Sequence, residues 1–400
     1  MSPSSQLVRD ALKRYKYNAP DLSLLERLYL DDFWKAIAEH VYPPWLAPNV
    51  ITLSGGTCIL LAAILSCWHS PRVHGDSPSW VYLLNAVLLF AYQTLDGSDG
   101  KQARKTGSGS PLGELMDHGV DAWTVSAISI FASDAFAFGI DHPTMWIILL
   151  GAQACFLFSN LHLLHVGRLH INNLDVMELQ TLMIVSLLAT AAYGTAIWTT
   201  RLPLPLGIAI PALDFDWHTG VPVKDAIVVV VVTHMILNAF TTTRAVVVLL
   251  REQSAEARKA RPPCAGLGPL SRQLASLATY AAFMMMSYFE ARSRLPASDV
   301  TQALLLLLLL GSFVFGVELL RLLASRVAHV PLPSVSLSFL CLVSFWLALR
   351  VEAFHLLPLP TALAGIVHVQ FFVSVTRAVA EALGIHPLRI RHAASTRKVD

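Results

Sequence analysis

The sequence has too little charge to be a set of water-soluble domains. Only 14% of its 400 residues are Asp, Glu, Lys or Arg, and 54% are hydrophobic, whereas soluble domains contain about 25% charged residues. The mean hydropathy is +0.56. Such a chain cannot cover several cores with polar surface, so we expect an integral membrane protein. The formal net charge of +2 lacks the strong basic excess typical of nucleic-acid binding, and no nucleic-acid partner is expected.

Cysteine is also scarce, and its positions exclude two kinds of site. The five cysteines show no paired spacing and lie mostly within apolar runs, which argues against a disulfide framework or a zinc site. They are Cys58, Cys67, Cys155, Cys264 and Cys341. The polar N-terminal segment is not followed by a short apolar stretch with a cleavage site, so we expect no removable signal peptide.

Long apolar runs dominate the rest of the chain. A bilayer core needs about 20 apolar residues in a helix, and ten segments approach this length, which predicts an all-α polytopic protein with about ten transmembrane helices. The predicted spans are Val50–Trp68, Trp80–Leu95, Asp121–Ile140, Thr144–Leu164, Met177–Trp198, Ala226–Leu249, Leu274–Phe289, Ala303–Leu323, Leu332–Leu349 and Phe354–Val375. Seven consecutive leucines, Leu304–Leu310, are expected to face lipid.

Basic residues gather in segments that ten spans would place on one side. These segments are the N-terminus, the connection around Lys101 to Lys105, the loop after Leu250 and the C-terminal tail. The excess of Lys and Arg predicts that this side is cytosolic. Residues 20–47 carry apolar side chains at helical spacing, which predicts an N-terminal amphipathic helix in the membrane interface. An ordinary packed cap on the bundle is the alternative.

One segment is acidic where its surroundings are apolar. Asp96 and Asp99 are three residues apart, and Asp117 and Asp121 are four apart, so each pair shares a helix face. A helix-breaking sequence, 106–111, lies between the pairs. We therefore expect a hairpin in which four carboxylates face one another at the membrane boundary.

Four carboxylates at a membrane edge repel one another and resist dehydration, so a cation must hold them together. Oxygen ligands favour Mg²⁺ or Mn²⁺, and four aspartates suffice for two ions that clamp a transferring phosphate. The small residues Gly100, Ala103 and Gly113 would let a nucleotide approach the backbone, and Arg104 offers a planar fork for phosphate.

Other interpretations of the acidic segment remain open. It could be a solvated turn that forms salt bridges with Lys101, Arg104 and Lys105. A cation transporter would also carry intramembrane aspartates, although transporters usually show internal repeats and broken helices near the bilayer centre. An inactive lipid-binding protein derived from a metal-dependent enzyme would have lost one of the four aspartates, and all four are present here.

The residues from Asp96 to Asp121 follow the spacing Asp-x₂-Asp-Gly-x₂-Ala-Arg-x₈-Gly-x₃-Asp-x₃-Asp. This pattern resembles the signature of the CDP-alcohol phosphotransferase family, membrane enzymes that transfer a phosphoalcohol from a CDP carrier to a hydroxyl. Segments such as 45–52, 92–94, 110–119 and 175–180 are more similar to the eukaryotic choline/ethanolamine phosphotransferases. The resemblance covers about the first half of the chain.

The resemblance implies a role for each motif residue. Asp96, Asp99, Asp117 and Asp121 would bind two divalent ions, Mg²⁺ or Mn²⁺, and through them the CDP pyrophosphate. The nucleotide pocket would be formed by residues at five positions, namely Asn49, Gly100, Ala103, Arg104 and Gly113. It also implies a catalytic core over 48–250, preceded by a cytosolic segment, 1–47, and followed by further helices, 251–380, and a basic tail, 381–400.

The general base is left between two residues. In the family the last aspartate, here Asp121, is commonly proposed, and in the choline/ethanolamine branch the rival is His118. A carboxylate bound to metal is a weaker base, so we favour His118 with Asp121 as ligand. A role for His118 in only orienting a carboxylate is the alternative.

A cationic headgroup needs negative charge or an aromatic face, and Glu178, Glu114 and Tyr92 are candidates for it, with packing or capping as their alternative role. Histidines 162, 165 and 170 are expected to lie at the interface without a metal, and Glu318 and Arg321 to form an ion pair.

The expected reaction is transfer of phosphocholine or phosphoethanolamine from CDP-choline or CDP-ethanolamine to diacylglycerol, which yields CMP. A related enzyme acting on a different alcohol is the nearest alternative. The resemblance implies the endoplasmic reticulum or Golgi membrane, a site facing the cytosol, and a protein able to form homodimers.

Overall fold

The computed structural model describes residues 3–14, 22–167, 176–202, 220–252, 266–331 and 337–390. These residues are almost entirely helical, and their one sheet pairs the two-residue strands β1 (Arg201–Leu202) and β2 (Val221–Pro222) antiparallel. The expectation of an all-α protein is therefore confirmed. Several residues singled out in the sequence lie outside the described ranges, among them Cys264, His170 and residues 391–400 of the C-terminal tail.

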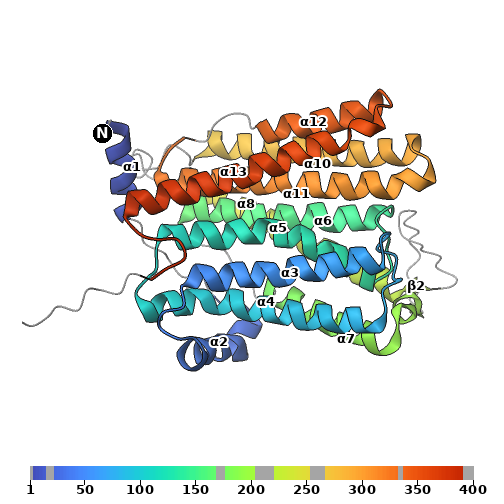
Figure 1. The fold of residues 1–400 in the computed structure, drawn as a ribbon, viewed down its shortest axis with the longest axis horizontal. Helices are drawn as coiled ribbons and strands as arrows, with labels where there is room; N and C mark the ends of the chain where they lie inside the picture. The colour runs from blue at the N-terminus through green and yellow to red at the C-terminus, as the bar shows by residue number, and fades with distance from the viewer. Residues whose placement is uncertain are drawn as a thin grey trace, which may run out of the picture.

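Among the described residues, ten long helices run side by side along the longest axis of the molecule (Figure 1). They are α3 (Pro48–His69), α4 (Ser79–Thr106), α5 (Pro111–Ala135), α6 (Pro143–Val166), α7 (Val176–Tyr193), α8 (Val223–Glu252), α10 (Leu267–Arg294), α11 (Ala297–Ala328), α12 (Leu337–Arg350) and α13 (Pro358–Leu383). Short 3₁₀ turns, η3 (Thr195–Thr199) and η4 (Phe354–Leu356), follow α7 and precede α13.

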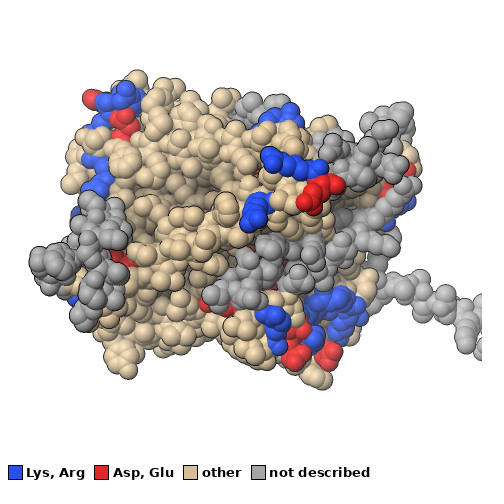
Figure 2. Space-filling model, turned by 180° about the vertical axis from the view of Figure 1, so that it is seen from behind, with Lys and Arg blue, Asp and Glu red and all other residues tan. Residues whose placement is uncertain are grey.

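Each of the ten apolar segments of the sequence thus contains a helix. Six helical stretches among the described residues are long and apolar enough to cross a membrane: α3, α6, α7, α8, α11 and the stretch Phe354–Leu383. Large apolar side chains such as Val230, which is 69% exposed, lie on the outside of the bundle. Figure 2 shows one face that is mostly free of Lys, Arg, Asp and Glu, with the charged residues in patches towards its ends. The chain is an integral membrane protein by these criteria, and the count of ten spans stays a prediction.

The connection between α4 and α5 is tighter than the predicted spans implied. Gly107 adopts φ +62°, which ends α4 in a left-handed turn. Ser110 then caps α5 by accepting a hydrogen bond from the backbone N–H of Gly113, and Pro111 occupies the first helical position. Because α5 begins ten residues before the predicted span, Asp117 and Asp121 both lie inside a helix.

The centre of the bundle is built around α5. This helix packs against α3, α6, α11 and α13. The leucine run lies in α11, where Leu304, Leu307 and Leu310 are fully buried. Leu309 is exposed, so the expectation that the run faces lipid was wrong for most of its residues but not for all of them. A leucine side chain is shielded from water equally well by other helices and by lipid tails. Composition therefore could not tell whether the run faces protein or lipid.

The N-terminal residues form two separate elements. Helix α1 (Pro3–Arg14) packs against α11 and α13, with Leu12 buried. Residues 24–41 form a helical segment in which α2 (Asp31–Ala36) stands between two π-helical turns, η1 (Glu26–Leu30) and η2 (Ile37–Val41). This segment contacts α4, and it buries Leu30 and Trp34 while exposing Leu28 and Val41.

Candidate active site

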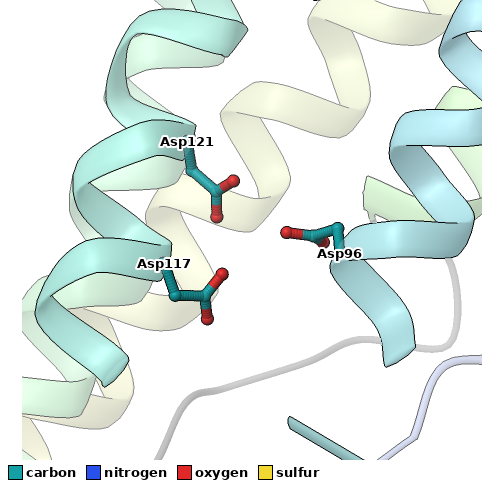
Figure 3. Close-up of side chains that lie close together, drawn as sticks. All are labelled: Asp96, Asp117 and Asp121. Atoms are coloured by element: carbon teal, nitrogen blue, oxygen red, sulfur yellow. The ribbon is translucent and has the colours of Figure 1, made fainter. Parts of the chain in front are cut away.

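Three of the four motif aspartates meet between α4 and α5. Oxygen atoms of Asp96, Asp117 and Asp121 lie within 4.8 Å of one another. Asp117 and Asp121 extend from successive turns of α5 and face Asp96 on α4 (Figure 3). The spacing in the sequence predicted this convergence, since each residue occupies the face of its helix that it was assigned.

The fourth aspartate is buried and is bonded to a third helix. The Thr52 hydroxyl on α3 donates a hydrogen bond to an Asp99 carboxylate oxygen. Asp99 lies three residues after Asp96, so it stays beside the other three carboxylates without belonging to their closest group. The structure therefore brings α3, α4 and α5 together around the acidic residues.

The three clustered carboxylates fit a divalent cation. Within the described ranges, no lysine or arginine forms an ion pair with Asp96, Asp117 or Asp121; the one basic neighbour is His118, whose Nε2 lies 3.9 Å from Asp117 Oδ2. Like charges this close require a counter-ion or protons. An all-oxygen donor set of this kind suits Mg²⁺ or Mn²⁺.

Two neighbouring side chains make hydrogen bonds that orient groups of the site. The Tyr92 hydroxyl donates to Asp121 Oδ1 at 2.6 Å, so the tyrosine holds a carboxylate of the cluster. His118 is 5% exposed, and its Nδ1 lies 2.7 Å from Oδ1 of Asn160 on α6. His118 Nε2 is left on the side of Asp117.

The residues expected to bind nucleotide line the same end of the hairpin. A side chain at Gly100 would contact only the Arg104 guanidinium, and one at Gly113 would contact Asn49 Oδ1 and the Ser110 hydroxyl, both at van der Waals distance. Space is therefore open beside both glycines. Asn49 itself donates a hydrogen bond of 2.7 Å to the Pro387 carbonyl, which brings the end of the described chain to this region. Ala103 is half-buried and Arg104 is exposed.

Two of the headgroup candidates are bonded to other parts of the protein. Glu114 is buried and forms an ion pair with Arg326 on α11. Glu178, at the start of α7, accepts a hydrogen bond of 2.8 Å from the backbone N–H of Leu25 and so helps to hold the N-terminal helical segment. Tyr92 alone among the three contacts the clustered aspartates. Arg321 pairs with Glu318 at 2.9 Å, as the spacing predicted.

The lysines near the aspartates do not form salt bridges with them. The alternative of a solvated turn required such salt bridges, whereas both lysines bond the N-terminal helical segment instead. Lys101 pairs with Asp31 at 2.5 Å, and Lys105 donates to the carbonyls of Ala38 and Tyr42, each at 2.7 Å. Both lysines therefore hold residues 24–42 against α4. Neither lysine neutralises the aspartates, which lie between α4 and α5.

Sequence reasoning missed three side chains that contact the motif: Thr52, Asn160 and Arg326. The available signal was a polar or charged residue inside or at the edge of an apolar helix, which is costly in a bilayer and usually has a partner. The partner of each lies on another helix, so the sequence did not reveal it.

Comparison with known sequences agrees with this site. A profile described as CDP-alcohol phosphatidyltransferase matches residues 45–316, which include α3, α4, α5 and all four aspartates. The chain belongs to the CDP-alcohol phosphatidyltransferase family. Its resemblance to that family, first seen in the motif, is confirmed over more than half of the chain.

Curated members of the family match over shorter stretches. The chain is 41% identical over 138 residues to choline/ethanolaminephosphotransferase 2 of Arabidopsis thaliana (34% of this chain, 35% of that protein). It is 43% identical over 124 residues to choline/ethanolaminephosphotransferase 1 of Saccharomyces cerevisiae (31% and 32%). It is 38% identical over 149 residues to ethanolaminephosphotransferase 1 of Homo sapiens (34% and 37%). The matched region thus spans about a third of each relative.

Proposed function

We propose that this chain transfers phosphocholine or phosphoethanolamine from CDP-choline or CDP-ethanolamine to the hydroxyl of diacylglycerol, releasing CMP. The observation that carries the proposal is the convergence of Asp96, Asp117 and Asp121 between two apolar helices. The names of the relatives support phosphocholine and phosphoethanolamine as the transferred groups, and the family supports a CDP-alcohol as their donor.

The carboxylates of Asp96, Asp117 and Asp121, with Asp99 beside them, would hold one or two divalent ions. Bound there, Mg²⁺ or Mn²⁺ would neutralise the diphosphate and the charge that develops on the leaving CMP phosphate. Arg104 and the open space at Gly100 and Gly113 would receive the nucleotide at the exposed end of the hairpin.

The chain's own residues would carry the proton transfer. The diacylglycerol oxygen attacks the phosphorus that bears the choline or ethanolamine, and the bond from that phosphorus to the CMP phosphate oxygen breaks. The proton of the diacylglycerol hydroxyl would pass to a base beside it, and the two candidates are His118 Nε2 and an Asp121 carboxylate oxygen. We favour His118, because Asp121 already accepts the Tyr92 hydroxyl and is a proposed metal ligand.

The proposed setting is a ten-span protein of the endoplasmic reticulum or Golgi, with the aspartates near the cytosolic face. Residues 24–42 would lie in the interface, where Leu28, Phe33 and Val41 face lipid headgroups and acyl chains. A homodimer is the proposed assembly.

CMP release tests the function directly. Purified protein with CDP-choline or CDP-ethanolamine and diacylglycerol should release CMP in Mg²⁺ and none in EDTA. Asp117→Asn should abolish release. Asp134→Asn is the matched control, because Asp134 is a buried carboxylate on the same helix that bonds the Gly75 backbone, away from the cluster. Release that persists in EDTA, or in the Asp117 variant, would refute the proposal.

A further inference from the structure

One face of α6 carries two buried amides that reach across to α5. Asn160 is 1% exposed and contacts His118, and Gln153, seven residues earlier, is fully buried and donates to the Ser126 hydroxyl at 2.9 Å. Both amides link the same two helices. Only one of them contacts a residue of the candidate active site.

The orientation of the Asn160 amide is fixed by a second hydrogen bond. Its Nδ2 donates to the Phe156 carbonyl at 2.8 Å. A reversed amide would place Oδ1 against that carbonyl oxygen, two acceptors in contact, which a buried site disfavours. Oδ1 is therefore the atom that faces His118, at 2.7 Å from Nδ1.

This orientation determines which imidazole nitrogen carries the hydrogen. An amide oxygen can only accept, so Nδ1 of His118 must donate. In the neutral imidazole the lone pair is then on Nε2, which lies 3.9 Å from Asp117 Oδ2 on the side of the clustered aspartates. The Phe156 ring, with its centroid 6.1 Å from that of His118, packs beside the imidazole.

From these contacts we infer that Asn160 is a positioning residue, which holds His118 in the Nδ1-protonated tautomer and directs the Nε2 lone pair towards the reacting hydroxyl. A neutral amide performs this without adding a further carboxylate to an interior that already holds Glu114 and the aspartates near His118. The catalytic part of the inference rests on the proposed transfer reaction.

The first test is spectroscopic and needs no substrate. In protein labelled with ¹⁵N-histidine, the His118 signals, assigned by their loss in His118→Ala, should report a protonated Nδ1 and a bare Nε2. Asn160→Leu should remove this preference. A bare Nδ1 in the wild type would overturn the inference whether or not the protein is a phosphotransferase.

The second test is kinetic. Asn160→Leu should lower kcat by about 10²-fold, the usual scale of general-base catalysis, with KM for the CDP-alcohol changed less than about threefold. Asn160→Asp retains an acceptor for Nδ1–H and should recover at least part of kcat. Equal kcat values for Asn160→Leu and the wild type would overturn the positioning role.

Gln153→Leu is the matched control. It removes the other amide link between α6 and α5, so a purely structural role of these amides predicts the same loss from both leucine variants. We expect Gln153→Leu to lower thermal stability and leave kcat within about twofold. If both leucine variants lower kcat equally, Asn160 only holds the helices together. If the wild type itself releases no CMP, the proposed function fails while the tautomer measurement still stands.

Discussion

Thr52 is the side chain through which α3 reaches the aspartates. Its hydroxyl donates to Asp99 and also lies 3.3 Å from the Pro48 carbonyl. Loss of a hydrogen bond to a metal-ligating carboxylate usually costs 10- to 100-fold in metal affinity or activity. If Asp99 ligates an ion, Thr52→Val should therefore raise the Mg²⁺ concentration for half-maximal CMP release about tenfold.

Thr57→Val is the control for this prediction. Thr57 lies on the same helix, is exposed, and bonds only the Leu53 carbonyl. A titration of activity with Mg²⁺ for both variants separates the effects. If the two curves coincide, Asp99 does not depend on Thr52.

At the scale of elements, helix α4 makes functional contacts on two of its faces. One carries Asp96 towards α5, and the other receives the N-terminal helical segment, where Trp34 packs directly on Gly97. A Cβ at Gly97 would lie 2.4 Å from the indole ring. Gly97→Ala should thus displace Trp34 and the helix turn beside Asp96, at a cost of about 1–3 kcal/mol in the free energy of unfolding.

Activity should fall in the same variant, because Asp96 is the next residue. Gly109→Ala is the control, since a Cβ there meets nothing within 4 Å. Thermal unfolding and CMP release measure both effects, and adding Trp34→Leu to Gly97→Ala should restore part of each. A Gly97 variant as stable and active as the Gly109 variant would contradict this packing argument.

The attachment of that segment should respond to acid. Burial would raise the pKa of Asp31, but hydrogen bonds from Lys101 and Lys35 outweigh it and lower that pKa. A carboxyl with a depressed folded pKa stabilises the protein above its unfolded pKa of about 4, and this stabilisation is lost as the pH falls through the folded pKa.

The contribution of Asp31 should therefore be constant through neutral pH and disappear only in acid. Asp31→Asn should lower the free energy of unfolding by about 1 kcal/mol at pH 7, and the difference from wild type should vanish below about pH 3. Unfolding curves of both proteins across this range test it. A difference that grows as the pH falls would have the wrong sign.

At the scale of the whole molecule, the crowded carboxylates should make stability depend on the ion. A ligand at 100 times its dissociation constant stabilises the folded state by about 2.7 kcal/mol, so Mg²⁺ should raise the melting temperature. Asp117→Asn removes a like charge and a proposed ligand together. It should be more stable than wild type in EDTA and less stable in Mg²⁺.

This reversal is checked by melting both proteins in the two buffers, with Asp134→Asn again as control. A variant less stable than wild type in both buffers would mean that Asp117 acts in packing. A wild-type melting temperature unaffected by Mg²⁺ would remove the metal from the proposal.

The sequence predicted the positions of the long helices and the facing aspartates, because apolar length and residue spacing are local properties. The predicted span began at Asp121, whereas the helix α5 begins at Pro111, a residue that suits the first turn of a helix. The sequence also misjudged the leucine run, whose burial depends on neighbours distant in the chain. The sequence did not single out Asn160, Thr52 or Arg326, because the partner of each lies on another helix.

The seat of Trp34 on Gly97 has a practical consequence for work with shortened versions of the protein. Removing residues 1–47 would take away none of the four motif aspartates, not His118, and none of the helices α3 to α13, and so would look harmless in an alignment. It would nevertheless strip the indole and the Asp31 carboxylate from the outer side of α4 and leave Lys101 and Lys105 bare at the membrane edge. Truncation should therefore leave residues 24–47 in place.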